Sequence, residues 1–305
     1  MSRYLVKRLG HAVFVVLGVS TVVFFILRLS GDPVLLMLPV DATQADVIRL
    51  RHALGFDRPL YVQYVRFMAS IFQGDAGESI RYGQPALRLV LERLPATLQL
   101  ASAALIFALG VAFPIGILSA TRRGSLIDNI GSVVALLGQA TPVFWLGIMF
   151  ILEFSVRLKW LPASGYGTIG HLVLPSITLG LYLAAVTTRM LRSSMLEVLG
   201  QDYVRTAKAK GLSNSAVVVK HTLKNALLPV ITVIGLQFAA LLGGSVVTET
   251  VFAWPGVGRL VIQAIYNRDY PLVQASVLVI SAVFVIANLV VDLIYGYIDP
   301  RIRYE

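Results

Sequence analysis

The chain has 305 residues, of which 57% are hydrophobic and 14% are charged, and its mean hydropathy is +0.78. A soluble domain carries about 25% charged residues, so this excess of apolar side chains excludes an ordinary soluble protein and requires lipid to cover it. The net charge of +10 would suit a nucleic-acid-binding protein, but the basic residues lie at the ends of apolar segments. That distribution indicates that the positive charge orients the chain in a membrane and attracts anionic lipid, and does not indicate nucleic-acid binding. Because the chain has no cysteine, disulfides, thiol catalysis and cysteine-based metal sites are excluded.

Six apolar segments are long enough to cross a hydrocarbon core, which requires about 20 residues in a helix. They cover residues 9–29, 98–120, 131–152, 172–192, 226–248 and 271–292. Because they are long and lack the alternating pattern of barrel strands, the sequence predicts an all-α polytopic membrane protein with six transmembrane helices. The first segment follows basic residues, as in a signal peptide, but its length and the lack of a small-x-small cleavage site predict a retained anchor.

The orientation follows from the short connections, because Lys and Arg collect on the cytoplasmic side of a membrane. With the N-terminus inside, the inner segments hold fourteen basic residues: Arg3, Lys7, Arg8, Arg122, Arg123, Arg189, Arg192, Arg205, Lys208, Lys210, Lys220, Lys224, Arg301 and Arg303. The short outer loops hold four, which are Arg157, Lys159, Arg259 and Arg268. The sequence therefore predicts that both termini are cytoplasmic.

This topology divides the chain into an N-terminal segment with the first helix (1–30), a long outer loop (31–96) and a five-helix core (97–305). Within the outer loop, Asp41 is expected to cap a short helix that ends near Gly55. A second short helix is indicated by apolar residues at helical spacing, which are Leu60, Tyr64, Phe67, Met68 and Ile71. This second helix can lie against the membrane or against other helices.

The cytoplasmic connection 193–225 has a more specific pattern. Residues 202–210 read as a short helix with an acid at its start and lysines at its end, as the helix dipole favours. Gly211 follows where a left-handed residue can end the helix. Ser213 can then cap a second helix, before Pro229 opens the fifth span. The small apolar face of the first helix, Tyr203, Val204 and Ala207, can seat in a groove of a partner protein. The alternative is a basic, solvated loop that only obeys the rule for cytoplasmic charge.

These residues resemble the cytoplasmic coupling loop of ABC importer permeases, in particular those that carry dipeptides, oligopeptides, nickel or glutathione. The similarity lies in the run from Asp202 to Ser213, in His221 and in Asn225-Ala226-Leu227-Leu228-Pro229. The general pattern is Glu-Ala-Ala, three residues, Gly and then Leu-Pro, and it is matched at Ala207, Gly211 and Leu228-Pro229. Arg205-Thr206 stands where the general pattern has Glu-Ala, and the interval from Gly211 to Pro229 is longer. Both departures resemble the peptide-importer branch.

The resemblance to this branch extends over essentially the whole chain. It is carried by Tyr4-Leu5-Val6-Lys7-Arg8-Leu9, Gly31-Asp32-Pro33, Glu92-Arg93-Leu94-Pro95-Ala96-Thr97, Leu174-Pro175-Ser176, Gly243-Gly244-Ser245, Trp254-Pro255-Gly256-Val257-Gly258-Arg259, Arg268-Asp269-Tyr270-Pro271 and Asp299-Pro300-Arg301. The order and joint presence of these pieces are more specific than any one of them. The long outer loop resembles the first of the two permease chains of such systems.

The resemblance implies a type I ABC importer permease in the bacterial inner membrane, which moves peptides or a related small solute inward by alternating access. It implies a second homologous permease subunit, two cytoplasmic ATPases and a periplasmic substrate-binding protein as partners. The residues expected to couple to the ATPases are Tyr203, Arg205, Thr206, Ala207, Lys208, Gly211 and Leu212. The sequence contains no Walker A motif, so ATP and Mg²⁺ are expected in the partner ATPases, and no cofactor or catalytic residue is expected here.

On the outer side, Glu249, Trp254, Pro255, Gly256 and Arg259 are expected to line the external mouth and contact the binding protein. The alternative is that Glu249 is an ordinary interfacial acid and Trp254 an interfacial anchor. The four histidines are scattered and show no metal-ligand spacing. A secondary transporter or channel would require ionisable groups at mid-membrane, and a membrane-embedded enzyme would require a convergent catalytic set. The sequence does not distinguish a dipeptide, a longer peptide, glutathione or a nickel chelate as the substrate.

Overall fold

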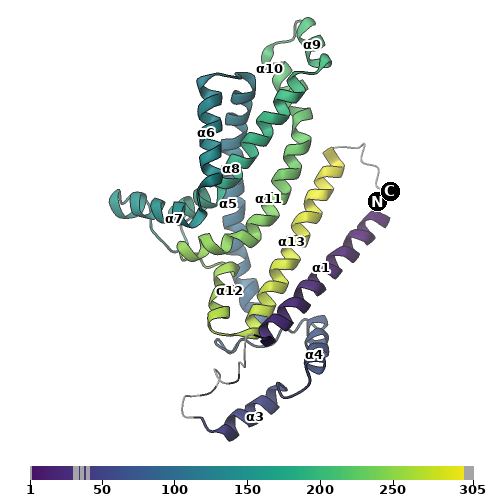
Figure 1. Cartoon of the computed structure of the whole chain (residues 1–305), viewed down its shortest axis with the longest axis vertical. Helices are drawn as coiled ribbons and strands as arrows, with labels where there is room; N and C mark the ends of the chain where they lie inside the picture. The colour runs from purple at the N-terminus through teal and green to yellow at the C-terminus, as the bar shows by residue number, and fades with distance from the viewer. Residues whose placement is uncertain (1, 30–33, 35–37, 39–41, 299–305) are drawn as a thin grey trace. The chain divides into compact units, whose positions relative to one another are not determined.

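The computed structural model describes residues 2–29, 34, 38 and 42–298, and their regular structure is helical apart from one isolated bridge between Glu78 and Pro85. The chain forms two compact units, and Figure 1 shows the helices from which they are built. One contains the residues up to Ala96 together with Pro255–Val285, and the other contains Thr97–Trp254 together with the residues from Ile286 onward. The predicted all-α class is confirmed.

Four helices are long and apolar enough to cross a membrane: Ala86–Thr121 (α5), Ile169–Leu199 (α8), Asn214–Gly243, and Tyr270–Leu293 within α13 (Tyr270–Ile298). The third of these runs through α10, η2 and most of α11 (Lys224–Val251). They correspond to the second, fourth, fifth and sixth apolar segments of the sequence. The first apolar segment lies in α1 (Ser2–Leu29), whose described apolar part, Val13–Leu29, is shorter than these spans.

The third apolar segment differs from its prediction. Instead of one helix over 131–152, the chain forms α6 (Leu126–Ala140) and then α7 (Val143–Phe150), which continues as η1 (Ile151–Arg157). The two parts are bent by 104°, so the described residues hold four spans, or five if this bent pair crosses once. Pro142 explains the break, because proline disfavours the helical conformation of the residue before it. Thr141 accordingly has an extended backbone, with φ −79° and ψ 124°.

The outer loop contains the two short helices that the sequence predicts, α3 (Gln44–Leu54) and α4 (Leu60–Phe72). The helix cap differs, because Thr43 rather than Asp41 begins α3, and Asp41 lies outside the described residues. Thr43 and Asp46 form a capping box, and the hydrogen bond from the Thr43 hydroxyl holds the pKa of Asp46 below its ordinary value. One face of α4 packs on α1, where the hydroxyls of Tyr64 and Thr21 are 2.8 Å apart.

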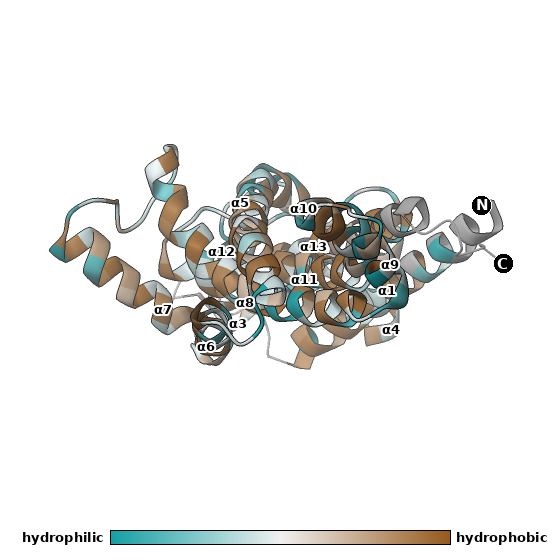
Figure 2. Ribbon diagram, turned by 90° about the horizontal axis from the view of Figure 1, so that it is seen from above, coloured by the Kyte–Doolittle hydropathy of each residue, from teal (hydrophilic) through white to brown (hydrophobic). Residues whose placement is uncertain are grey.

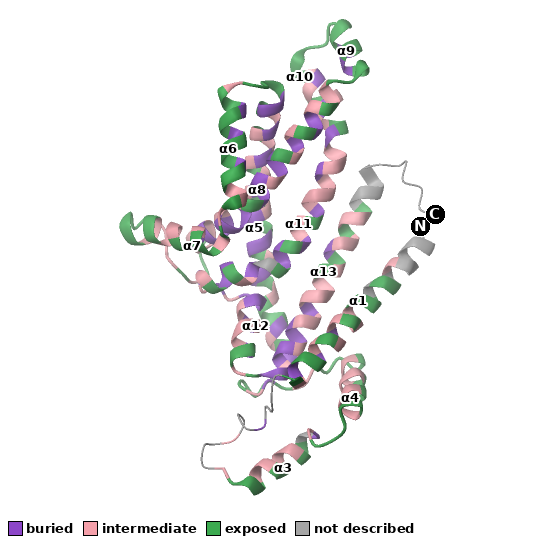
Figure 3. Cartoon of the chain, viewed as in Figure 1, coloured by how far each residue is buried: buried purple, intermediate pink, exposed green. Residues whose placement is uncertain are grey.

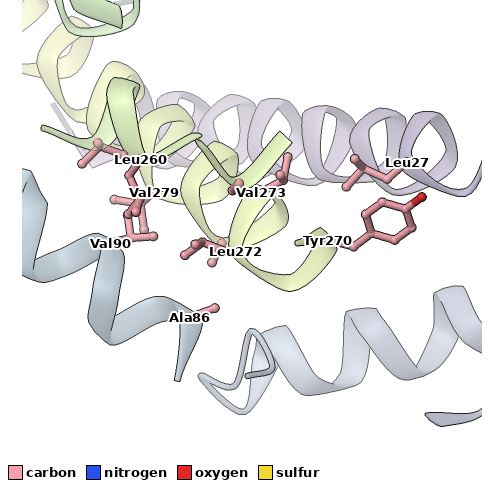
Figure 4. Close-up of a cluster of buried hydrophobic side chains, with 11 residues drawn as sticks. Leu27, Ala86, Val90, Leu260, Tyr270, Leu272, Val273 and Val279 are labelled. Atoms are coloured by element: carbon pink, nitrogen blue, oxygen red, sulfur yellow. The ribbon is translucent and has the colours of Figure 1, made fainter. Parts of the chain in front are cut away.

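The first unit has a core in which the start of α5, α12 (Val257–Tyr266) and the start of α13 meet α1 (Figure 4). The buried side chains of this core are Leu27, Ala86, Val90, Val257, Leu260, Ala264, Tyr270, Leu272, Val273, Ala275 and Val279. They fix the entrance to α5 and the turn between α12 and α13.

In the second unit α8 packs against both α6 and α11 and has more buried residues than any other helix, whereas α6 is largely exposed (Figure 3). The exposed side of α6 is apolar (Figure 2), since Val133, Val134, Leu136 and Leu137 are about half exposed or more. An apolar surface of this extent is expected to face lipid or another subunit rather than water.

Candidate functional site

The connection 193–225, which the sequence places in the cytoplasm, folds largely as the sequence predicts. Residues Asp202–Ala209 form α9, and Gly211 follows with φ 79°, the left-handed conformation expected of a glycine beyond a helix end. The Ser213 hydroxyl accepts a hydrogen bond from the Ala216 N–H at 3.3 Å, so the predicted cap of the next helix is present. The short helix, the glycine turn and the second helix start are thus confirmed.

The second helix does not end before Pro229. It begins as α10 (Asn214–Ala216), continues as a wider helical turn, η2 (Val217–Leu223), and enters α11 without a break. Pro229 lies inside α11, where membrane helices tolerate proline because neighbouring groups satisfy the freed carbonyl. The expectation that Pro229 opens the fifth span is therefore wrong. The glycine turn is joined directly to a membrane-spanning helix.

The apolar face of α9 points into this chain. Val204 is fully buried and Ala207 is 6% exposed, and both pack on Val217 together with Val198 and Leu199. The groove that receives these side chains is therefore built by the chain itself. Ala207, one of the predicted coupling residues, holds α9 in place and presents almost no surface.

Hydrogen bonds complete the attachment of α9 to the start of the fifth span. The Tyr203 hydroxyl accepts a hydrogen bond from the Asn225 side-chain amide at 2.9 Å and donates one to the His221 carbonyl at 3.4 Å. The Tyr203 ring itself remains 44% exposed. A displacement of α9 would therefore pull on η2 and α11 rather than bend a loose loop.

The remaining predicted coupling residues form an exposed surface with two basic side chains on α9 and the turn after it. They are Arg205, Thr206, Lys208, Gly211 and Leu212. Arg205 pairs with Asp202 at 3.3 Å, but both side chains are largely exposed, so the pair adds little stability. This surface is exposed on the chain.

On the other side of the second unit, Glu249 is fully buried near the end of α11. The Thr97 hydroxyl donates to its carboxylate at 2.8 Å and the Ser245 hydroxyl at 3.0 Å. The backbone N–H of Trp254 donates to the backbone carbonyl of Glu249 at 2.8 Å. Trp254 is 1% exposed, and its ring meets the Tyr166 ring edge to face. Glu249 and Trp254 therefore lie inside this chain and present almost no surface to lipid or water. They support the turn from inside.

The other three outer residues, Pro255, Gly256 and Arg259, belong to the first unit. With Arg93, Leu260 and Gln263 they line an open, mostly polar cavity of about 180 Å³ at the start of α12. The sequence grouped Arg259 with Glu249, whereas the structure groups it with Arg93.

Sequence reasoning missed two buried carboxylates, and the first is Asp269. It caps α13 by accepting a hydrogen bond from the Leu272 N–H at 3.2 Å, and it also accepts from the Ser79 hydroxyl and the Ile80 and Arg81 N–H groups. An Asp directly before a long apolar helix is a signal for the cap. No local signal indicates that the outer-loop residues from Ser79 onward bind the same carboxylate.

The second is Asp128, in the first turn of α6 and 3% exposed. Arg192 of α8 binds it through two nitrogens, with Nη2 at 2.9 Å, and the Gly124 N–H also donates to it at 2.9 Å. A bidentate contact of this kind ties α6 to α8. Among the described residues, no group of His, Asp or Glu side chains has the arrangement of a metal site.

Residues 112–304 match the family described as "Binding-protein-dependent transport system inner membrane component", and residues 1–101 match the N-terminal domain of the same kind of protein. The chain belongs to this family. It is therefore a multi-pass permease subunit of an ABC importer, as the resemblance of the coupling loop predicted. It is not the ATP-hydrolysing subunit of that importer.

Curated relatives match over their full length. The permease is 39% identical to the dipeptide transport system permease protein DppB of Escherichia coli (strain K12) and 43% identical to the glutathione transport system permease protein GsiC of Salmonella paratyphi A, with 100% of each chain covered. The fold is also that of solved importers. A chain of the inward-facing MetNI methionine ABC transporter, 22% identical, superposes with a TM-score of 0.58 over 69% of this chain and 96% of its own length.

Proposed function

We propose that this permease moves dipeptides, oligopeptides or a related small solute such as glutathione or a nickel chelate from a periplasmic binding protein into the cytoplasm. The support for a peptide-like substrate is the full-length similarity to permeases named for dipeptide and glutathione transport. The chain crosses the bacterial inner membrane six times, with α1 as the first span and the bent α6–α7 pair as the third. Both termini are cytoplasmic, as the fourteen inner basic residues favour.

The assembly contains a second, homologous permease, two ATPases that bind ATP and Mg²⁺, and the binding protein. The coupling loop 193–225 belongs to the five-helix core 97–305. The exposed apolar side of α6 supports an environment of lipid or a second membrane subunit on that side.

The main support for coupling is the way α9 is held. Its buried side, Val204 and Ala207, locks it to the helix that becomes α11, and its exposed side offers Arg205, Thr206 and Lys208 to the cytoplasm. An ATPase can shift the permease only if it binds this surface differently in its two states. Closure of the ATPase pair then moves α9, and η2 and α11 move with it, which gives alternating access.

On the periplasmic side, we assign different roles to the two groups of residues. Arg259, with Pro255 and Gly256, contacts the binding protein from the polar cavity at the start of α12. Glu249 and Trp254 act as positioning residues, because their buried contacts hold the turn that leads to Pro255.

The coupling surface can be tested by crosslinking, since the chain has no natural cysteine to remove. In the full transporter, Thr206→Cys and Lys208→Cys labelled with a photoactivated thiol reagent are expected to crosslink to an ATPase subunit. Arg122→Cys, which is also exposed but lies in another predicted cytoplasmic connection, is the matched control. Crosslinks from Arg122→Cys alone would overturn the assignment of α9.

The energy source gives a second test. Uptake of labelled peptide by cells that contain the full system is expected to stop when ATP is depleted. It should continue when a protonophore collapses the proton gradient while ATP is maintained. The reverse pattern would contradict ATP coupling, because a proton-driven carrier depends on the gradient alone.

A further inference from the structure

A small cavity lies between α5, α6 and α8 in the second unit. It is near the part of α8 that carries Arg189 and Arg192. Its volume is about 170 Å³. It is lined by Ser119, Gly131, Ser132, Ala135, Thr188, Arg189 and Arg192. The coupling surface and the outer turn use none of these residues.

Five of the seven lining residues carry hydrogen-bond donors, within a surface that is otherwise mostly apolar. Ser119 belongs to the lining and is 1% exposed, and its hydroxyl has no hydrogen-bond partner within the described part of the chain. A buried hydroxyl without a partner is costly, so such a group in a native protein points to a missing ligand or water. Ser132 and Thr188 add two more hydroxyls.

The cavity also carries an excess positive charge. Asp128 occupies Nε and Nη2 of Arg192, which leaves the remaining N–H groups of that guanidinium available. No carboxylate among residues 2–29 and 42–298 forms an ion pair with Arg189 within 4.0 Å, and no acid belongs to the lining. Hydroxyl donors beside an unneutralised arginine suit an anionic group with several oxygen acceptors.

The size and surroundings indicate which anion fits. Pockets for drug-sized ligands are about 300–1,000 Å³, so a cavity of 170 Å³ is too small to enclose a peptide substrate. Directly beside the lining residues of α6, the exposed side chains Val133, Val134, Leu136 and Leu137 form an apolar surface. A ligand with a small anionic head and long apolar chains satisfies both features.

We propose that this cavity binds the phosphate of an anionic phospholipid, such as phosphatidylglycerol, with the acyl chains lying along α6. Basic pockets between transmembrane helices on the cytoplasmic side are known to take such headgroups. The phosphate accepts hydrogen bonds from Arg189, Arg192 and Ser119. A bound lipid at this place braces α6 against α8 beside the Asp128–Arg192 ion pair.

Native mass spectrometry of the complete, delipidated transporter titrated with phosphatidylglycerol or phosphatidylcholine tests this site. The wild-type permease is expected to retain phosphatidylglycerol preferentially. Arg189→Gln should weaken retention about tenfold, which corresponds to about 1.4 kcal/mol, and Ser119→Ala should weaken it less. Arg122→Gln is the matched control, because it removes an exposed charge outside the cavity.

Three outcomes would overturn the proposal. If Arg122→Gln weakens binding as much as Arg189→Gln, the lipid senses only the general surface charge. If both lipids bind equally to the wild-type transporter, the cavity does not distinguish an anionic headgroup from a zwitterionic one. If millimolar inorganic phosphate displaces the lipid completely and itself protects the delipidated transporter against heat, the site takes free phosphate instead of lipid.

Discussion

Gly211→Val is expected to abolish ATP-coupled uptake while the permease still inserts into the membrane. Gly211 has φ 79° and open space around its Cα, so the obstacle to a side chain is the backbone conformation and not a clash. A left-handed conformation costs an ordinary residue roughly 1–2 kcal/mol, and a β-branched residue more. The chain can relieve this strain by rotating the turn, which separates Val204 and Ala207 from Val217. The coupling surface would then no longer move with α11.

Gly124→Val is the matched control for this experiment. Gly124 has φ 76°, is equally open, and lies in the connection between α5 and α6. It should carry the same backbone strain without affecting α9. Uptake of labelled substrate and the amount of permease in the membrane should be measured for both variants. Normal uptake by Gly211→Val, or equal loss in both variants, would argue against a special role of the α9 turn.

Asp269→Ala is expected to destabilise the first unit by about 3 kcal/mol or more, since hydrogen bonds to a charged group are each worth about 1.5–3 kcal/mol. Asp269 is fully buried and accepts hydrogen bonds from Ser79, Ile80, Arg81 and Leu272. Its removal leaves the buried donors of Ser79 and Leu272 without this acceptor and frees the outer-loop residues that close on the start of α13. The midpoint of thermal unfolding of the purified transporter should fall, and protease should cut after Arg81 much faster.

Two further variants separate the carboxylate from simple loss of volume. Asp269→Asn keeps the size and one acceptor oxygen and should lose about half as much stability. Ser79→Ala removes only the hydroxyl that donates to Asp269 and accepts from the Tyr82 N–H, so it should cost about 1 kcal/mol. A wild-type unfolding temperature and protease pattern for Asp269→Ala would show that the carboxylate does not anchor the outer loop.

Local sequence features accounted for most of the helices. Long apolar runs require backbone hydrogen bonds within the segment, and this requirement predicted the helices around residues 98–120, 172–192, 226–248 and 271–292. The turn after α9 could also be predicted from neighbouring residues, because it depends only on the glycine at position 211 and the serine at position 213. Hydrophobicity alone did not reveal the bend at Pro142, although the proline was visible in the sequence and its effect on Thr141 is a local one.

The direction in which a side chain points could not be predicted from neighbouring residues. Val204 and Ala207 form an apolar face that suits either a partner's groove or an internal contact, and only the placement of Val217 decided for the latter. Glu249 ends an apolar segment as an interfacial acid would. It is buried because Thr97, 152 positions earlier in the chain, supplies a hydroxyl to it.

The sequence by itself determined that this protein is an all-helical membrane permease with a basic connection between its fourth and fifth apolar segments, because composition, apolar length and short motifs act over neighbouring residues. The tertiary structure decided which of its polar groups meet. Ser79 and Asp269 are 190 positions apart, and Asp128 and Arg192 are 64 positions apart. Such pairs depend on how helices pack, and packing is set by many side chains at once. The same packing places Arg189 and Ser119, whose hydroxyl has no partner among the described residues, in the lining of one cavity. This cavity could not be predicted from the sequence.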